Sequence, residues 1–278
     1  MRVVRSLAVL VVTAQMGCSA REGVTAASAP SSAAVAPTAP VEAPTSSSGQ
    51  HAPKEPSRAA AADVPLYPVR WWSGLGLRTL ADADKLYAAA DPDAFGELQR
   101  GAVTKRPSDC PEWTKLHADG FEPMTTVEAQ ADSGAELRCM TLLLLQRAQP
   151  AKASYIRDLA WDSSLLSVLP ASLATAFNKE REQAVSKAAS QGQTLAQFDR
   201  KAKVKTSDDE HTLEIVEGDG QTMIVVHAEV WGDLNGDGVD DLAVSVVNGA
   251  TQGTYSYVRL LTLSRDASDA LLRPIVAK

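Results

Sequence analysis

The spacing of apolar residues divides the chain beyond residue 62 into a helical half and a strand half. Before about residue 200, apolar positions recur at helical intervals. One face of the first predicted helix collects Leu77, Leu80, Ala83 and Tyr87. Thr79 is placed to cap this helix, with Asp82 three residues further on.

Two further segments of the helical half differ in how firmly their spacing selects a helix. Residues 178–191 are charged and rich in alanine, which predicts a surface helix. Residues 136–147 include the run Leu142–Leu145. Because a continuous apolar run has no period of its own, this segment fits a buried helix or a core strand.

After residue 201 apolar positions alternate with a period of two, which is typical of strands. The predicted strands span 212–217, 222–231, 242–246 and 255–263, followed by an edge strand at 271–276 that Pro274 interrupts. The Asp219–Gly220 step is a strong hairpin signal. Helices followed by a meander predict an α+β fold rather than a parallel α/β fold, with a mainly helical part at 63–200 and an antiparallel sheet at 201–278.

Residues 1–17 predict a cleaved export signal. A basic start precedes the apolar run Leu7–Ala14, which is too short for a membrane span of about 20 residues. Gly17 lies directly before Cys18, and this pair resembles the lipobox of bacterial lipoproteins, which implies that Cys18 carries a lipid. Gln15 departs from the aliphatic residue of that pattern, so an ordinary signal peptide with another cleavage point is the alternative.

The lipobox resemblance implies a protein of the bacterial cell envelope that is anchored to the membrane through Cys18. Ser19 follows the cysteine in place of Asp, which under the common Gram-negative sorting pattern indicates the outer membrane. Residues 18–62 contain six of the 15 prolines and no Leu, Ile, Phe, Trp or Tyr. Such a stretch cannot bury enough apolar surface to fold, so we expect a disordered tether.

The charge of the chain limits its partners. The chain has 34 acidic and 27 basic residues, a net charge of −7, and loss of the basic signal makes it more negative. Nucleic-acid binding depends on cationic contacts to phosphate, so we expect no nucleic-acid partner. The same charge argues against adsorption to anionic lipid, so the covalent lipid is the membrane contact that we expect.

The cysteine count also supports lipidation of Cys18. Three cysteines leave one unpaired in an exported protein, and lipidation of Cys18 leaves Cys110 and Cys139 as a pair. Because export leads to an oxidising environment, we expect a disulfide, which would stabilise the fold by roughly 3–4 kcal/mol. Two buried free thiols are the alternative.

The segment GDLNGDGVDDLAV places oxygen-bearing side chains at positions 1, 3, 5 and 9 of a predicted turn: Asp233, Asn235, Asp237 and Asp241. Calcium takes six to eight oxygen ligands, and alternating residues of a tight turn direct their oxygens to one point. Gly238 permits a sharp reversal that directs the carbonyl of Val239 to the same point. Position 12 is Val244 rather than Glu, so the loop is not an EF-hand.

This strand-flanked loop resembles the calcium loop of FG-GAP (VCBS-type) repeats. The flanking MIVVHAEVWGD and DDLAVSVV also resemble the strands of such repeats. The resemblance implies Ca²⁺ ligation by the side chains of Asp233, Asn235, Asp237 and Asp241 and by the carbonyl of Val239. It covers about 20 of the 278 residues, occurs once and lacks the Phe-Gly pair, so it does not imply a propeller. A polar turn is the alternative, although its three carboxylates would repel each other without a cation.

Other candidate chemistry is limited to histidines and tryptophans. His227 and Glu229 share one face of a predicted strand, where such a pair more often lines a polar surface than binds a metal. Trp71 and Trp72 form either an exposed platform for a glycan or protein ligand or a cover for the edge of the core.

These observations predict a lipid-anchored envelope protein with a structural calcium site that acts as a binding or structural module. The common motifs for nucleophilic, zinc, redox and phosphate chemistry do not occur in the sequence. One alternative is a periplasmic hydrolase that uses His117, His211 or His227 with a neighbouring carboxylate. The other is a lipoprotein that inhibits an enzyme.

Overall fold

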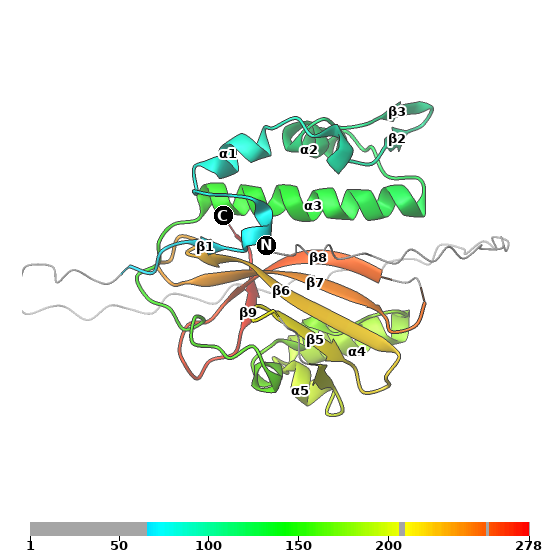
Figure 1. The fold of residues 1–278 in the computed structure, drawn as a ribbon. Coiled ribbons are helices and arrows are strands. Elements are labelled where there is room, and N and C mark those ends of the chain that lie inside the picture. Colours follow the sequence, from blue (N-terminus) through cyan, green and yellow to red (C-terminus); the bar gives the residue numbers. More distant parts are fainter. Residues whose placement is uncertain (1–65, 206–208, 254–255, 278) are drawn as a thin grey trace, which may run out of the picture. The chain divides into compact units, whose positions relative to one another are not determined.

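Seven antiparallel strands form one sheet in the computed structural model, which describes residues 66–205, 209–253 and 256–277 (Figure 1). The strands are β1 (Arg70–Trp71), β4 (Lys203–Lys205), β5 (Thr212–Val216), β6 (Thr222–Gly232), β7 (Asp241–Ala250), β8 (Ser256–Ser264) and β9 (Arg273–Ile275). Their order is β4-β5-β6-β7-β8-β9, and β1 pairs with β6. Because β4 to β9 follow the order of the chain, most of the sheet is the predicted meander.

The hairpin between β5 and β6 has the predicted turn. Gly220 has a φ of 70°, a left-handed conformation that glycine adopts without strain. The backbone carbonyl of Glu217 accepts the N–H of Gly220 at 2.8 Å, and the N–H of Glu217 donates to the carbonyl of Thr222 at 3.0 Å. The carboxylate of Asp219 accepts the N–H of Gln221 at 2.8 Å. The turn is thus closed by contacts within a few residues.

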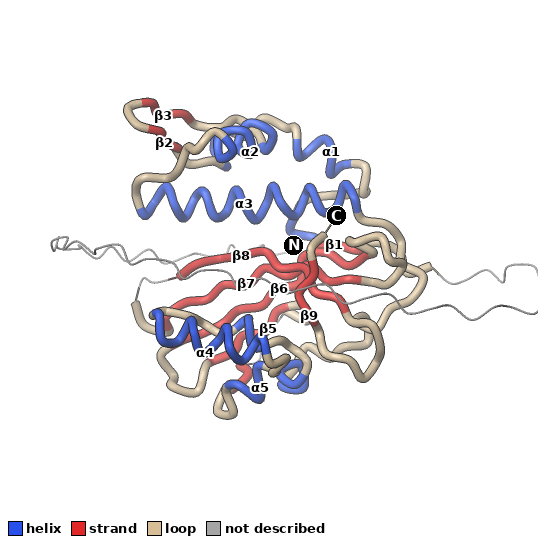
Figure 2. Tube along the Cα trace, turned by 180° about the vertical axis from the view of Figure 1, so that it is seen from behind, coloured by secondary structure: helices blue, strands red, loops and turns tan. Residues whose placement is uncertain are grey.

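Three helices and a small second sheet lie over one face of the main sheet (Figures 1 and 2). They are α1 (Asp82–Tyr87), α2 (Cys110–Ala118), α3 (Thr126–Arg147), β2 (Leu98–Arg100) and β3 (Val103–Lys105). Thr125 and Glu128 form a capping box at the start of α3. The buried side of α3 includes Leu142 and Leu145, so the run that had two interpretations is helical.

A disulfide joins α2 to α3, as the cysteine pairing predicted. Cys110 and Cys139 have Cα atoms 5.4 Å apart and are 2% and 1% exposed. Cys110 is the first residue of α2, and Asp109 caps that helix by accepting the N–H of Glu112 at 2.8 Å. The bridge therefore fixes the start of the short helix to the middle of the long one.

The opposite face of the sheet is covered by α4 (Lys179–Ser190) and α5 (Leu195–Phe198), with two short 3-10 helices, η3 (Ser163–Ser167) and η4 (Ala171–Leu173). Asn178 caps α4, which matches the surface helix predicted at 178–191. The core on this side combines strand and helix residues: Ile215, Ile224, Val244, Leu263, Leu165, Leu173 and Leu195. Two apolar layers, one on each face of the sheet, therefore hold the fold together.

The predicted α+β class is confirmed, and the differences are local. The first helix begins at Asp82, three residues after the predicted cap Thr79, and Ala81 takes the cap position. The predicted pairing of Thr79 with Asp82 is present, since the Asp82 carboxylate accepts the N–H and the hydroxyl of Thr79, at 2.9 and 3.0 Å. β9 is an edge strand that includes Pro274, as its missing N–H requires. The strand β1 was not predicted, since two residues carry no periodicity.

The export signal at 1–17, Cys18 and the tether at 18–62 lie outside the described residues. Within the described residues, no helix has both the length and the apolar character that a membrane span requires.

Candidate metal centre

The loop between β6 and β7 is held from outside by the segment that follows α3. Gln149 and Asp233 pair through two backbone hydrogen bonds of 2.8 and 3.0 Å. At the other end of the loop, Asp240 donates its N–H to the carbonyl of Ala153 at 2.8 Å. Both ends are therefore fixed by protein contacts alone.

Asp233 organises the turn with its carboxylate. Oδ1 accepts the N–H groups of Gly236 and Asp237 at 2.6 and 3.2 Å, and Oδ2 accepts the N–H of Gly238 at 2.8 Å. Gly236 and Gly238 have φ angles of 84° and 86°, which a residue with a Cβ rarely adopts. The two glycines are thus required by the reversal of the chain, as predicted for Gly238.

Asn235 and Asp237 lie on the exposed side of the loop and contact each other. The Asn235 amide donates to Asp237 Oδ2 at 2.9 Å, and Asp237 Oδ1 accepts the N–H of Val239 at 2.7 Å. A carboxylate oxygen has two lone pairs, so one hydrogen bond leaves each oxygen able to contact a cation.

Asp241 is the buried ligand candidate, with 0% exposure. Its Oδ2 accepts the N–H of Leu234 at 3.0 Å, while Oδ1 is buried and has no hydrogen-bond partner among the described residues. Burial is the main reason that the pKa of Asp241 rises from 3.8 to about 6. The negative charges of Asp237 and Asp233 add to this rise. The nearby Ser264 hydroxyl, which makes no hydrogen bond of ordinary geometry among the described residues, and the Leu234 N–H oppose it.

The donor set of the loop fits a hard cation in composition but is not gathered around a common point. Across the described segments, no three His, Cys, Asp or Glu side chains form a group that could hold a metal ion. The carbonyl of Val239 accepts no hydrogen bond from the described residues, and Asp241 Oδ1 also lacks a partner. Calcium binding would therefore use these two oxygens and the remaining lone pairs of Asp233 and Asp237, and it would require the loop to bring them closer to a common point.

His227 lies between two carboxylates on the face of the sheet that carries α3. Its Nδ1 is 3.2 Å from Glu229 Oε1, and its Nε2 is 3.6 Å from Asp209 Oδ2. The hydroxyl of Ser245 donates to Glu229 Oε1 at 2.6 Å. In a serine hydrolase the hydroxyl must contact the imidazole, whereas here it contacts the carboxylate.

The other two histidines have separate surroundings. His117 Nε2 is 2.8 Å from Asp132 Oδ1, which also accepts the indole N–H of Trp113 at 2.8 Å. His211 packs edge-on against Trp231, with ring centroids 5.0 Å apart. These contacts are typical of histidines that support packing.

Trp71 and Trp72 have different environments. Trp71 belongs to β1 and packs, partly buried, against the core beneath α3. Trp72 is 39% exposed, and its ring lies 4.7 Å from that of His227 at an interplanar angle of 81°. A Cβ added to Gly74 would lie 2.1 Å from the Trp72 ring, so the glycine makes room for it. Of the two, Trp72 is the side chain available to a ligand.

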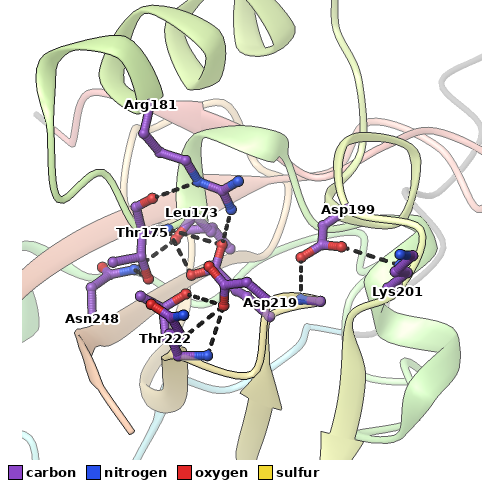
Figure 3. A network of polar contacts seen from close by, with 11 residues as sticks. Leu173, Thr175, Arg181, Asp199, Lys201, Asp219, Thr222 and Asn248 are labelled. Atoms are coloured by element: carbon purple, nitrogen blue, oxygen red, sulfur yellow. Dashed lines mark hydrogen bonds and ion pairs between the residues drawn. The ribbon is translucent and has the colours of Figure 1, made fainter. Parts of the chain in front are cut away.

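A buried ion pair on the opposite face joins α4 to the hairpin (Figure 3). The guanidinium of Arg181 is 2.7 Å from Glu217 Oε1, a carboxylate with a fully buried side chain. The N–H of Thr175 also donates to this carboxylate, and Asn248 donates to the Thr175 hydroxyl and the Leu173 carbonyl at 3.1 and 2.9 Å. The charges are paired within the protein, which indicates a structural role.

No family model, curated protein sequence or solved structure matches the chain.

Proposed function

We propose that this protein is a lipid-anchored protein of the bacterial envelope that serves as a binding or structural module and has a structural calcium site. The observation that carries the calcium proposal is the buried Asp241, whose Oδ1 lacks a hydrogen-bond partner in the described structure at the end of a loop with two further carboxylates. An unpaired buried carboxylate oxygen is costly, and a cation would remove that cost. The ligands proposed are Asp233, Asn235, Asp237 and Asp241 through their side chains and Val239 through its carbonyl.

Calcium should raise the thermal stability of the protein. At a concentration ten times its dissociation constant, calcium is expected to add about 1.4 kcal/mol to the free energy of unfolding by mass action. Asp237→Asn should reduce this gain strongly while changing the calcium-free stability little, because Asp237 is exposed and asparagine keeps the side-chain oxygen that accepts the Val239 N–H. The measurement is a thermal melt with and without calcium, together with calorimetric titration.

The matched control is Asp219→Asn in the turn between β5 and β6. Asp219 also accepts backbone N–H groups beside a glycine, but it belongs to a turn with no proposed cation. This variant should keep the full calcium response. The calcium proposal is wrong if the unchanged protein neither binds calcium at millimolar concentration nor melts at a higher temperature with it.

The pH dependence of the calcium effect gives a second measurement. In the metal-free protein the pKa of Asp241 is raised to about 6, so the folded state favours the protonated carboxyl group. The stability that this protonated group contributes is fully present below about pH 3.8 and is lost as pH rises through 6. Calcium requires the ionised carboxylate and therefore competes with the proton. The calcium-induced shift in melting temperature should be larger at pH 7.5 than at pH 5.

The lipid anchor is tested through Cys18. The mature protein should partition into detergent, and Cys18→Ser should prevent lipid attachment and processing at this site. Mass spectrometry of the mature N-terminus should find a diacylglyceryl modification on the cysteine. A mature chain that is soluble and begins at another residue would rule out this anchor and favour the ordinary signal peptide.

A further inference from the structure

A cavity of about 370 Å³ is lined by residues of α1, of α3, of β6 and of the segment between β1 and α1. Its apolar walls include Trp72, Leu75, Leu86, Leu137 and Leu142. Figures 1 and 2 show that α3 crosses the sheet above β6, β7 and β8. The volume lies at the lower end of the range of small-molecule sites, so the cavity is large enough for one small organic ligand.

Glu229 places a buried carboxylate in this apolar cavity. The register of β6 against β7 shifts between Ala228 and Val230, and this bulge puts Glu229 and Val230 on the same side, beneath α3. Bulges commonly redirect a side chain next to a binding site. Glu229 is 5% exposed, and its Oε1 is used by Ser245 and His227. No described residue donates a hydrogen bond to its Oε2.

Thr141 is a second polar group with an unmet hydrogen-bonding capacity. Its side chain is fully buried and lines the cavity, and its hydroxyl has no partner in the described part of the chain. A threonine in a helix can donate to the carbonyl four residues earlier, but this hydroxyl does not. A buried hydroxyl without a partner is unfavourable, so the polar groups of this cavity wall are not all satisfied in the described structure.

We propose that this cavity binds a small molecule with an apolar body and a protonated amine. The ammonium group donates to Glu229 Oε2, and the apolar body packs against Trp72 and the leucines. A carboxylate in apolar surroundings favours a cation over a neutral donor, because the ion pair offsets the cost of burying the charge. The ring face of Trp72 adds a favourable surface for the same cation.

Arg138 also lines the cavity but does not change the sign of the ligand. Its guanidinium is 2.8 Å from the carboxylate of Asp91, so its charge is already paired within the protein. Glu229 therefore remains the charge that selects the ligand. None of the residues that line this cavity belongs to the proposed calcium site or to the anchor.

The test is calorimetric titration of the mature protein with 2-phenylethylamine, 2-phenylethanol and 3-phenylpropanoate, which share an aromatic body and differ in the polar end. We expect the amine to bind at least tenfold more tightly than the alcohol, and the carboxylate not to bind. Glu229→Gln should weaken binding of the amine at least tenfold. Glu214→Gln, on β5 of the same sheet and outside the cavity lining, is the matched control and should leave binding unchanged.

Gly134→Leu provides a variant that should fold even if Glu229→Gln does not. Gly134 lines the cavity from α3, and an added Cβ would contact nothing within 4 Å. Leucine favours the helix more than glycine does and would occupy the cavity, so this variant should lose binding without loss of stability. The proposal is overturned if no amine binding is measured at millimolar concentration, if the alcohol binds equally well, or if Gly134→Leu binds the amine like the unchanged protein.

Discussion

Arg157→Ala is expected to lower the free energy of unfolding by about 3–5 kcal/mol, because it leaves the carboxylate of Asp240 buried without its counter-ion. The Asp240 side chain is fully buried, and the Arg157 guanidinium contacts both of its oxygens, at 2.6 and 3.2 Å. The hydroxyl of Ser154 donates to the same carboxylate at 2.9 Å. Arg157 also donates to the carbonyl of Pro68, so one side chain joins the loop before β7 to the chain before β1.

The measurement for Arg157→Ala is urea denaturation at pH 7, with Arg273→Ala as the matched control. Arg273 forms a bidentate pair with Asp266, but both side chains are more than half exposed, at 54% and 58%. Loss of an exposed ion pair costs at most about 1 kcal/mol. Equal losses in the free energy of unfolding for Arg157→Ala and Arg273→Ala would contradict a larger stabilising role for the buried pair of Arg157 and Asp240.

The double variant Arg157→Met with Asp240→Leu separates the cost of an unpaired charge from the value of the pair. Replacing a buried ion pair by apolar residues of similar volume is often neutral or stabilising. We therefore expect the double variant to recover most of the stability that Arg157→Ala loses. If the double variant is as unstable as Arg157→Ala, the loss comes from the packing of Arg157 or its contact with Pro68 instead.

Reduction of the Cys110–Cys139 disulfide is expected to lower the free energy of unfolding by roughly 3–4 kcal/mol. The bridge closes a loop with a sequence separation of 29 residues and so restricts the unfolded chain. The Cys110→Ala, Cys139→Ala double variant should show a similar loss. The measurement is denaturant unfolding of the Cys18→Ser chain with and without reductant, since this chain contains no other thiol.

Two controls accompany the disulfide measurement. Both sulfur-bearing residues are nearly fully buried, so thiol reagents should react with the bridge only after reductant and denaturant are combined. In the double variant, reductant should have no effect on the unfolding curve. Recovery of both cysteines as free thiols from protein purified out of the envelope would contradict the Cys110–Cys139 disulfide.

Features set by neighbours in the sequence were predictable without the structure. The Asp219–Gly220 hairpin, the surface helix at 178–191 and the sharp reversal at Gly238 depend on residues that are close in the sequence, and each is present. The partner of Cys110 followed from the cysteine count and from the expected export to an oxidising environment. The calcium ligands remain a proposal, since the sequence gives their spacing but not whether a cation draws them together.

Some features could not be predicted, because they depend on contacts between distant parts of the chain. The run Leu142–Leu145 is part of α3, whose apolar side packs over the sheet. Because the run itself has no period, the sequence alone could not select a helix there. Trp72 and Glu229, which the sequence offered as candidates, line the cavity, whereas Thr141, a hydroxyl directly before the apolar run, was not singled out. That this hydroxyl lacks a partner is a property of the packed structure.

The sequence by itself determined the class of the fold, the Asp219–Gly220 hairpin and the cysteine pair, because periodicity and turn chemistry involve residues close in the sequence and the pairing follows from the number of cysteines. Tertiary structure alone decided that β1 joins β6, that Arg157 neutralises Asp240 from 83 residues away, and that a bulge turns Glu229 towards α3. These arrangements follow from which groups are buried together. The free energy of a buried charge depends on its spatial neighbours, and those are known only after the chain has folded.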